Sequence, residues 1–576
     1  MNAQSSSQPP TRERSADEDA ALWARFRGAF GDPVKPAGKS WLKLVPSTPP
    51  QLDWALFSPI AEINEARAEA ILDGIWRVGL ERYDTAPEGR PWLIEAASQH
   101  FLDQVHRFDW LPDLMSRDDL GRALAGELVD AWTTTHGKFD GFSWRAGPCA
   151  DRVWNWMRCG SALFEGQDGA IILDRQDCLF RQIDHLEGLA DTTADGEARF
   201  RIQCCLVVAA ALRGETESMR PAIEQLEAEC LAQILPDGGH VSRSPFRLLQ
   251  AAIDLLAVKD VLEARGHDVP KGVSKWIPRM GAMLTFFQAD DGALFPFNGG
   301  EEASVRLVNA VIDTIDPAIR KFSFSPKSGY QKLQRGDLRL LLDVGAAPEG
   351  GFATGAHAGA LGFELAHGRD RIVTSCGFTS RVNVDWQAAV RRTSAHSTLV
   401  LGGRDSAAFQ KDDATRLLVA AGPEGVSAKR LEEGEEIWLD AQHSGYKDTL
   451  GLLHRRRLFM SGDGSRLTGE DSLVRPISAG EAEDDHPITF EIRFHLHPTT
   501  KAAIASDSIR VVSESGKYWR FKTSHEGARL ERSIYLARGT VERTEQIVLA
   551  GRAQPNGDGT IPPNCVRWAF VKDGGP

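Results

Sequence analysis

The 576-residue chain contains His357, Cys376 and His396, whose side chains have metal-binding or acid–base capacity, within one stretch of 40 residues. Imidazole and thiolate are ligands that zinc prefers, and imidazole is also a common general base near neutral pH. The stretch GAHAGALGFELAHGRDRIVTSCG (355–377) contains an alternating apolar run, a turn and a second apolar run, which predict a β-hairpin. Two interpretations are open: a metal and catalytic centre, or core histidines that hydrogen-bond each other across two strands.

Composition excludes several classes of protein. The net charge of −13 argues against a nucleic-acid partner, because no basic surplus neutralises phosphates. The eight cysteines show no paired spacing and read as reduced, buried thiols. No apolar leader and no transmembrane segment are visible, so the sequence alone predicts a cytoplasmic protein. Fifteen tryptophans against five tyrosines fit either a large helical core or indole rings that stack on sugars.

The chain changes character near residue 325. From about residue 50 to residue 310, apolar residues recur every three or four positions, as in residues 58–80. This spacing predicts paired antiparallel helices. The later apolar segments are short and end at Gly, Asp or Asn. Several alternate apolar and polar residues, which predicts antiparallel strands. We therefore expect an α+β multidomain protein with a disordered tail (1–17), a helical domain (18–315) and an antiparallel β-sandwich (316–576).

Eight motifs in order resemble the heparinase II/III-like family across about residues 140–570. They are QILPDGGHVSRSP (233–245), FFQADDGALFPFNGGEE (286–302), SGYQKL (328–333), AHAGALGFEL (356–365), AHSTLVLGGRDSAAF (395–409), SGYKDTLGLLHRRRLFMSGDGSRLTGEDSL (444–473), IRFHLHP (492–498) and VRWAF (566–570). The resemblance implies an incomplete N-terminal α/α-toroid followed by the sandwich. It also implies β-elimination on a uronic-acid polysaccharide, in which a carboxylate is neutralised, a base removes the C5 proton and an acid protonates O4.

The reactive histidine of the resembled family is missing. The family's sandwich motif, His-x-His-x-Asp ahead of an apolar run, aligns with GAHAGALGF. His357 matches the second histidine, Gly355 stands at the first, usually catalytic one, and Gly359 stands at the Asp. The resemblance therefore implies that the hairpin kept its scaffold histidine and lost its reactive one.

The metal set implied by the resemblance is also altered. Ser375 stands at the position of a metal-binding Asp, and His396 matches the last metal histidine. His357, His396 and Cys376 are the predicted ligands, with zinc as the metal, because thiolate and imidazole suit it. Neighbouring residues on a strand face opposite sides, which counts against Cys376 as the substitute for the residue at 375.

The helical half departs from the family as well. Arg247 stands where the family has its Tyr, and the usual Asn-His pair is replaced by Glu197 and Ala198. A permanently charged arginine cannot act as an ordinary base, although it can pair with a uronate carboxylate. His240 is the titratable ring of this motif and the predicted base, and it also reads as a loop residue bonded to a carbonyl.

Six residues are predicted to hold substrate. The resemblance places four of them on a helix that lines the cleft or beside it, and two come from the motifs at 286–302 and 328–333. The set is Trp144, Arg152, Asn155, Trp156, Asn298 and Tyr330.

Two functional hypotheses follow. The first is a polysaccharide lyase that acts on an acidic polysaccharide, with His240, Arg247 and His357 together in one cleft. The second is a catalytically silent protein of the same fold that binds a glycan or assists assembly of an envelope polymer. The family commonly works in the periplasm or outside the cell, in contrast to the cytoplasmic location that the sequence alone predicts.

Overall fold

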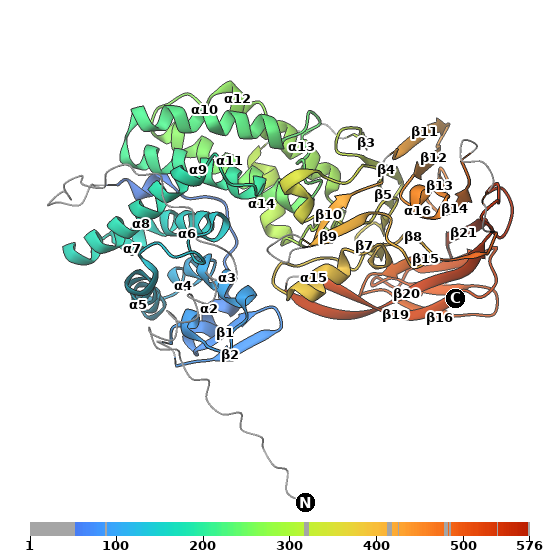
Figure 1. Ribbon diagram of the computed structural model, residues 1–576, viewed down its shortest axis with the longest axis horizontal. Helices are drawn as coiled ribbons and strands as arrows, with labels where there is room; N and C mark the ends of the chain where they lie inside the picture. Colours follow the sequence, from blue (N-terminus) through green and yellow to red (C-terminus); the bar gives the residue numbers. More distant parts are fainter. Residues whose placement is uncertain are drawn as a thin grey trace, which may run out of the picture. The chain divides into compact units, whose positions relative to one another are not determined.

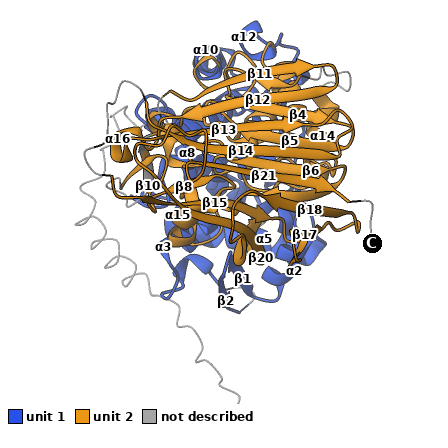
Figure 2. Cartoon of the chain, turned by 90° about the vertical axis from the view of Figure 1, so that its right-hand side faces the viewer, with its two compact units in different colours: residues 1–230, 253–274 blue, residues 231–252, 275–576 orange. Residues whose placement is uncertain are grey.

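The chain divides into two compact units. The computed structural model describes residues 52–573 except 87–88, 316–321, 412–416, 424, 477–481, 483–484 and 538, so the predicted tail at 1–17 lies outside the described residues. Unit 1 comprises Met1–Cys230 and Ile253–Ser274, and unit 2 comprises Leu231–Ala252 and Lys275–Pro576 (Figure 2). Residues 275–315, predicted as part of the helical domain, belong to unit 2.

Unit 1 is built mainly of helices (Figure 1). Acidic side chains start several of them: Asp118 accepts a hydrogen bond from the Gly121 amide, and Asp195 from two amides of the next turn. The elements are η1 (Trp54–Leu56), α2 (Glu65–Leu72), β1 (Ile75–Val78), β2 (Glu81–Asp84), η2 (Pro91–Leu93), α3 (Gln99–His106), α4 (Leu111–Met115), α5 (Asp119–His136), α6 (Ala146–Arg158), α7 (Gly160–Phe164), α8 (Gly169–Leu189), α9 (Gly196–Arg213), α10 (Thr216–Gln233), α11 (Pro245–Ala264) and α12 (Lys271–Ser274), of which α10 and α11 also contribute to unit 2.

The helix predicted over residues 58–80 is wrong outside its middle third. Asn64 caps α2 by accepting the Arg67 amide, and the helix ends at Leu72. Gly74 has φ of +74°, and a Cβ there would lie 2.1 Å from the Thr85 carbonyl oxygen. Glycine therefore permits a turn into the β1–β2 hairpin, which the apolar spacing did not reveal.

Unit 2 contains two helices followed by an antiparallel sandwich, which confirms the predicted helical region followed by antiparallel sheets. Its elements are α13 (Ile277–Phe287), α14 (Val305–Ile315), β3 (Phe324–Ser325), β4 (Tyr330–Arg335), β5 (Leu338–Asp343), η3 (Gly350–Thr354), β6 (Phe363–His367), β7 (Asp370–Thr374), α15 (Val384–Val390), η4 (Thr393–Ala395), β8 (Leu399–Leu401), β9 (Ala408–Lys411), β10 (Leu417–Ala421), β11 (Ser427–Glu433), β12 (Glu436–His443), α16 (Lys447–Leu450), β13 (Leu453–Met460), β14 (Arg466–Val474), β15 (Ile488–Leu496), β16 (Lys501–Ile504), β17 (Ile509–Val512), β18 (Tyr518–Thr523), β19 (Arg529–Ala537), β20 (Thr540–Ala553) and β21 (Cys565–Lys572).

Two large sheets form the sandwich. One has eight strands in the order β11-β12-β13-β14-β21-β18-β17-β16. The other has nine and includes β19-β20-β15-β7-β6-β5-β4-β3, with β8 paired to β15. Their inner faces share one apolar core, in which the rings of Phe363 and Trp568 stack with centroids 5.7 Å apart. The predicted hairpin is confirmed as β6 and β7, which pair antiparallel around the turn at Gly368.

The closure of the unit 1 helices into a toroid stays a prediction. Within the described ranges, no helix combines the length and apolar character needed to cross a bilayer.

Candidate functional site

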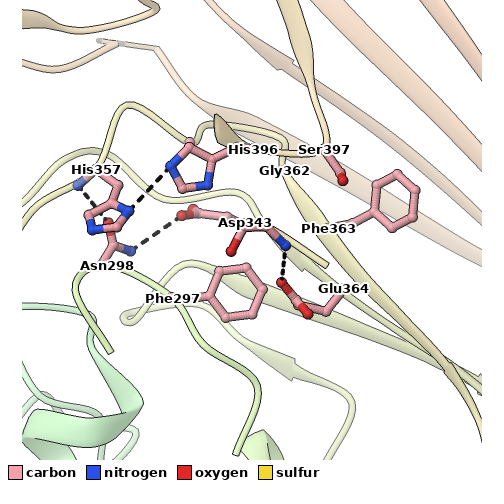
Figure 3. A pocket seen from close by; sticks show the side chains of 11 residues that line it. Phe297, Asn298, Asp343, His357, Gly362, Phe363, Glu364, His396 and Ser397 are labelled. Atoms are coloured by element: carbon pink, nitrogen blue, oxygen red, sulfur yellow. Dashed lines mark hydrogen bonds between the residues drawn. The ribbon is translucent and has the colours of Figure 1, made fainter. Parts of the chain in front are cut away.

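His357 and His396 form a buried pair in unit 2. His357 lies in the loop between η3 and β6, and His396 directly follows η4. His357 Nδ1 and His396 Nε2 are 3.2 Å apart, and each residue is 8% exposed (Figure 3). Burial lowers the pKa of His396 to about 4 and, together with the charges of His396 and Arg391, lowers the pKa of His357. Both rings are therefore neutral at pH 7, and one donates a hydrogen bond to the other.

A small cavity adjoins this pair. Its volume is about 10 Å³, which is room for about one water molecule and far too little for a sugar ring. The lining includes Asn298, Asp343, Glu364 and Ser397 beside the two histidines (Figure 3). Glu364 Oε1 accepts the Ser375 amide at 2.9 Å, whereas its buried Oε2 has no hydrogen-bond partner.

The predicted zinc ligands do not form a three-ligand site. Cys376 Sγ contacts His495 Nδ1 at 3.6 Å and the Ser533 hydroxyl at 3.8 Å, away from the histidine pair, as the alternation of side chains along a strand requires. Burial raises the pKa of the Cys376 thiol to about 11, so it is protonated at pH 7. In the described part of the chain, no three His, Cys, Asp or Glu side chains are grouped to hold an ion. The metal implied by the family resemblance therefore does not fit these residues.

We expect the substitution Glu364→Gln to remove a pH dependence of stability. Burial raises the pKa of Glu364 from 4.5 to about 8, although Arg371 and nearby donors oppose the shift. Between these pH values only the unfolded chain releases the proton, so the free energy of unfolding falls as pH rises, by about 2–4 kcal/mol. Gln keeps the acceptor for the Ser375 amide and cannot ionise. Urea unfolding at several pH values from 5 to about 9 should show the decline in the wild type alone, and equal slopes would contradict the assignment.

His240 is enclosed by its own hydrogen bonds. The Ser242 amide donates to its Nδ1 at 3.1 Å, which leaves Nε2 as the protonated nitrogen that donates to Gln233 Oε1 at 3.2 Å. Burial and the charge of Arg247 lower the pKa of His240 to about 3. The basic lone pair that a proton abstraction needs is therefore already occupied.

The three residues predicted to share one cleft make different direct contacts. Arg247 is half-buried, donates to Gln250 Oε1 at 2.8 Å, and its charge acts on His240. His357 instead pairs with His396, and its amide donates to Asn298 Oδ1 at 3.3 Å.

Four of the predicted substrate-binding residues lie in the core of unit 1, and this is a correction. Trp144, Arg152, Asn155 and Trp156 are at most 7% exposed. Arg152 donates to Gln182 Oε1 and to the carbonyls of two other residues, and it lies over the Trp132 ring at 4.2 Å. Their polar and aromatic groups serve internal packing, since α6 is buried on most of its surface.

The other two, Asn298 and Tyr330, belong to a buried ion-pair network rather than to an open site. Asn298 Nδ2 donates to the Tyr330 hydroxyl at 3.0 Å and to Asp343 Oδ2 at 3.4 Å, and Tyr330 donates to the Arg243 carbonyl at 2.6 Å. Arg243 forms an ion pair with Asp343 and donates to three backbone carbonyls. This network, which the sequence analysis missed, fixes the start of the sandwich against residues 237–243.

A second buried network lies inside the eight-stranded sheet. Asp471 accepts hydrogen bonds from Arg456 at 2.8 Å, His454 at 2.7 Å and the Trp568 indole at 2.7 Å. Arg456 also donates to the carbonyls of Leu361 and Ser397, at 2.6 and 2.8 Å. The ion pair of Arg456 and Asp471 therefore holds the loops that carry His357 and His396.

The two glycines at the altered family positions differ in their surroundings. A Cβ added at Gly355 would meet nothing within 4 Å. A Cβ added at Gly359 would lie 3.0 Å from His396 Cγ and Nδ1. The His396 ring therefore occupies the space that a side chain at 359 would need.

Comparisons with known proteins agree with this architecture. The family described as Heparinase II/III-like, C-terminal, matches residues 318–569. FtsZ-localized protein C of Caulobacter vibrioides is 31% identical over 528 residues, covering 88% of each chain. A crystal structure of heparinase III has a TM-score of 0.68 at 14% identity and covers 97% of this chain and 91% of its own. A heparan sulfate lyase from Pedobacter heparinus has a TM-score of 0.54 at 14% identity, with coverage of 97% and 89%. At such identities the two structures show the shared fold, and with the sequence matches they establish that the chain belongs to the heparinase II/III-like family.

Proposed function

We propose that the chain is a catalytically silent member of this family, which binds an acidic polysaccharide and acts in envelope assembly at the bacterial division site. The observation that carries the proposal is the state of His240. Its Nδ1 accepts the Ser242 amide and its Nε2 is bonded to Gln233, so the candidate base has no free lone pair for a substrate proton.

The residues at the other reactive positions support the same conclusion. Gly355 offers no side chain where the family resemblance implies a catalytic histidine. Arg247 stands in place of the Tyr and stays protonated at neutral pH, so it can neutralise a carboxylate but cannot remove a proton. An acidic sugar can therefore bind without the groups that this chain has lost, whereas β-elimination requires those groups.

The cellular part of the proposal rests on the relative. FtsZ-localized protein C is, by its name, located with FtsZ, and this chain matches it over 88% of both lengths. A fluorescent fusion should therefore form a band that coincides with labelled FtsZ in dividing cells. A diffuse signal, or a band that persists where FtsZ is absent, would contradict the proposed place of action.

We expect no lyase product from the wild-type protein on a panel of uronate polysaccharides. The measurement is the ultraviolet absorbance of the C4–C5 double bond that β-elimination creates. Binding to the same polymers should persist in His240→Asn, since both ring nitrogens of His240 are bonded within the protein and contribute nothing to a ligand. An absorbance increase that depends on enzyme concentration and disappears in His240→Asn would show an active lyase and end the silent proposal.

A further inference from the structure

An apolar strip crosses the outer face of the eight-stranded sheet. The register joins Leu431 to Trp438, Trp438 to Phe459, Phe459 to Thr468 and Thr468 to Ala569 on five neighbouring strands, which Figure 2 shows side by side. These side chains alternate with inward-facing core residues, so they point away from the core. Leu431 is 53% and Trp438 45% exposed. The rings of Trp438 and Phe459 lie with centroids 4.4 Å apart and form an open aromatic platform.

A ladder of alternating charge runs beside this strip. The next row of the register joins Lys429, Asp440, Arg457, Glu470 and Arg567 on the same five strands. Glu470 accepts from both Arg457 and Arg567, at 2.7 and 2.9 Å, so two guanidinium groups share one carboxylate. The Arg457 side chain is 44% exposed and that of Arg567 67%, which leaves donors on both available to a ligand.

The outward-facing strand residues of this sheet carry more basic than acidic groups, although the chain carries a net charge of −13. The outward-facing strand residues are basic at Lys429, Arg455, Arg457, Arg466, Lys501, Arg510, Arg520, Lys522 and Arg567 and acidic at Glu433, Glu436, Asp440 and Glu470. Two further carboxylates from neighbouring loops, Asp507 and Asp573, pair with Lys522 and Arg520. A basic excess on one face of an acidic protein favours an anionic ligand there.

We propose that this face is a binding site for an anionic polysaccharide, outside the family's catalytic positions. The ligand class rests on the proposed function, whereas the location of the site is inferred from the exposed aromatic and charged residues of the outer face. The chain of sugars lies across the strands along the strip, which is about 19 Å long for five strands at ordinary sheet spacing. Apolar faces of the sugar rings stack on Trp438 and Phe459, and carboxylates pair with Arg457 and Arg567.

The mixed signs of the ladder favour a sugar polymer over an acidic membrane surface. Asp440 and Glu470 would oppose a dense layer of anionic headgroups, whereas they can accept hydrogen bonds from sugar hydroxyls. A narrow strip with donors and acceptors beside it matches a linear ligand that carries both hydroxyl and carboxylate groups. An acidic polypeptide lacks sugar rings for the aromatic platform, so it should bind through charge alone.

Calorimetric binding of polygalacturonate to the full chain at low salt tests this site. We expect Trp438→Ala and Arg457→Glu each to weaken binding by about tenfold, and added salt to weaken the wild type. Phe324→Ala and Arg220→Glu are matched controls. Phe324 is 54% exposed on the other sheet, and the Arg220 side chain is 82% exposed on α10. Both controls should bind as the wild type does.

Further probes separate the alternatives. Poly-glutamate and phosphatidylglycerol vesicles carry charge without sugar rings, and dextran carries sugar rings without charge. The proposal is overturned if polygalacturonate does not bind, if Trp438→Ala and Arg457→Glu bind it like the controls, or if the vesicles or poly-glutamate bind as tightly. Unsaturated product from the same polymer would end the silent proposal and leave the outer face intact. If Trp438→Ala and Arg457→Glu bind like the controls and no unsaturated product forms, the site on the outer face is excluded and the silent proposal stands.

Discussion

The substitution Asp471→Ala is expected to destabilise unit 2 by about 3–5 kcal/mol, because it leaves the buried Arg456 guanidinium without its counter-charge. Asp471 and Arg456 are 2% and 0% exposed, so water cannot replace the lost carboxylate. Burial alone would raise the pKa of Asp471, but Arg456 and His454 offset it and hold that pKa below its usual value. The stability from this group is therefore present above about pH 4 and is lost as the pH falls.

Urea unfolding followed by circular dichroism measures the loss. Asp440→Ala is the matched control on β12 of the same sheet, since its partner Arg455 is half-exposed and such pairs contribute about 0–1 kcal/mol. Hydrogen exchange should also increase near Leu361 and Ser397, whose carbonyls Arg456 holds. Equal effects of the two substitutions would show that the buried network does not stabilise the sandwich.

The substitution Arg243→Ala is expected to cost a similar amount, about 3–5 kcal/mol. It leaves Asp343 buried and removes donors from the carbonyls of Ser328, Gly329 and Ala346, at 2.9, 3.2 and 2.9 Å. Arg243→Lys should recover only part of the loss, because an ammonium group lacks the planar fork that reaches several acceptors. Thermal and urea unfolding of the three proteins provide the comparison.

A double-mutant cycle with Asp343→Ala separates the ion pair from the backbone contacts. The double substitution should cost less than the sum of the single ones, since no buried charge is left without a partner. Arg335→Ala is the control, because its pairing with Glu432 lies at the surface. Additive losses would mean that Arg243 acts through the carbonyls alone.

Local patterns predicted the elements of the sandwich well. The alternation in residues 363–374 with a glycine at the turn was sufficient for the β6–β7 hairpin, although both faces of each strand are buried. The same alternation explains why Cys376 points away from the small cavity that Ser375 lines. In β13, Arg455 and Arg457 face outward and Arg456 inward, a division that period two predicts without revealing the partner at Asp471 on the next strand.

Tertiary contacts set the limits of sequence reasoning in the helical region. Residues 75–80 belong to the stretch whose apolar spacing fits a helix, yet the close approach of Thr85 to Gly74 selects a hairpin. Trp156 and Arg152 on α6 match a family helix that lines the cleft, and only the packing of neighbouring helices shows that both are core residues. His240 illustrates the same limit, because its hydrogen bonds come from a turn geometry that spacing does not encode.

The unequal surroundings of two glycines bear on how this lineage could change again. A Cβ at position 355 meets no neighbouring atom within 4 Å, so the first atom of a new side chain fits there without displacement. A Cβ at position 359 lies 3.0 Å from two atoms of the His396 ring, so a side chain there requires that ring to shift by a few tenths of an ångström. Restoring a side chain is therefore easier at position 355, where the family resemblance implies a catalytic histidine, than at position 359, where it implies an aspartate.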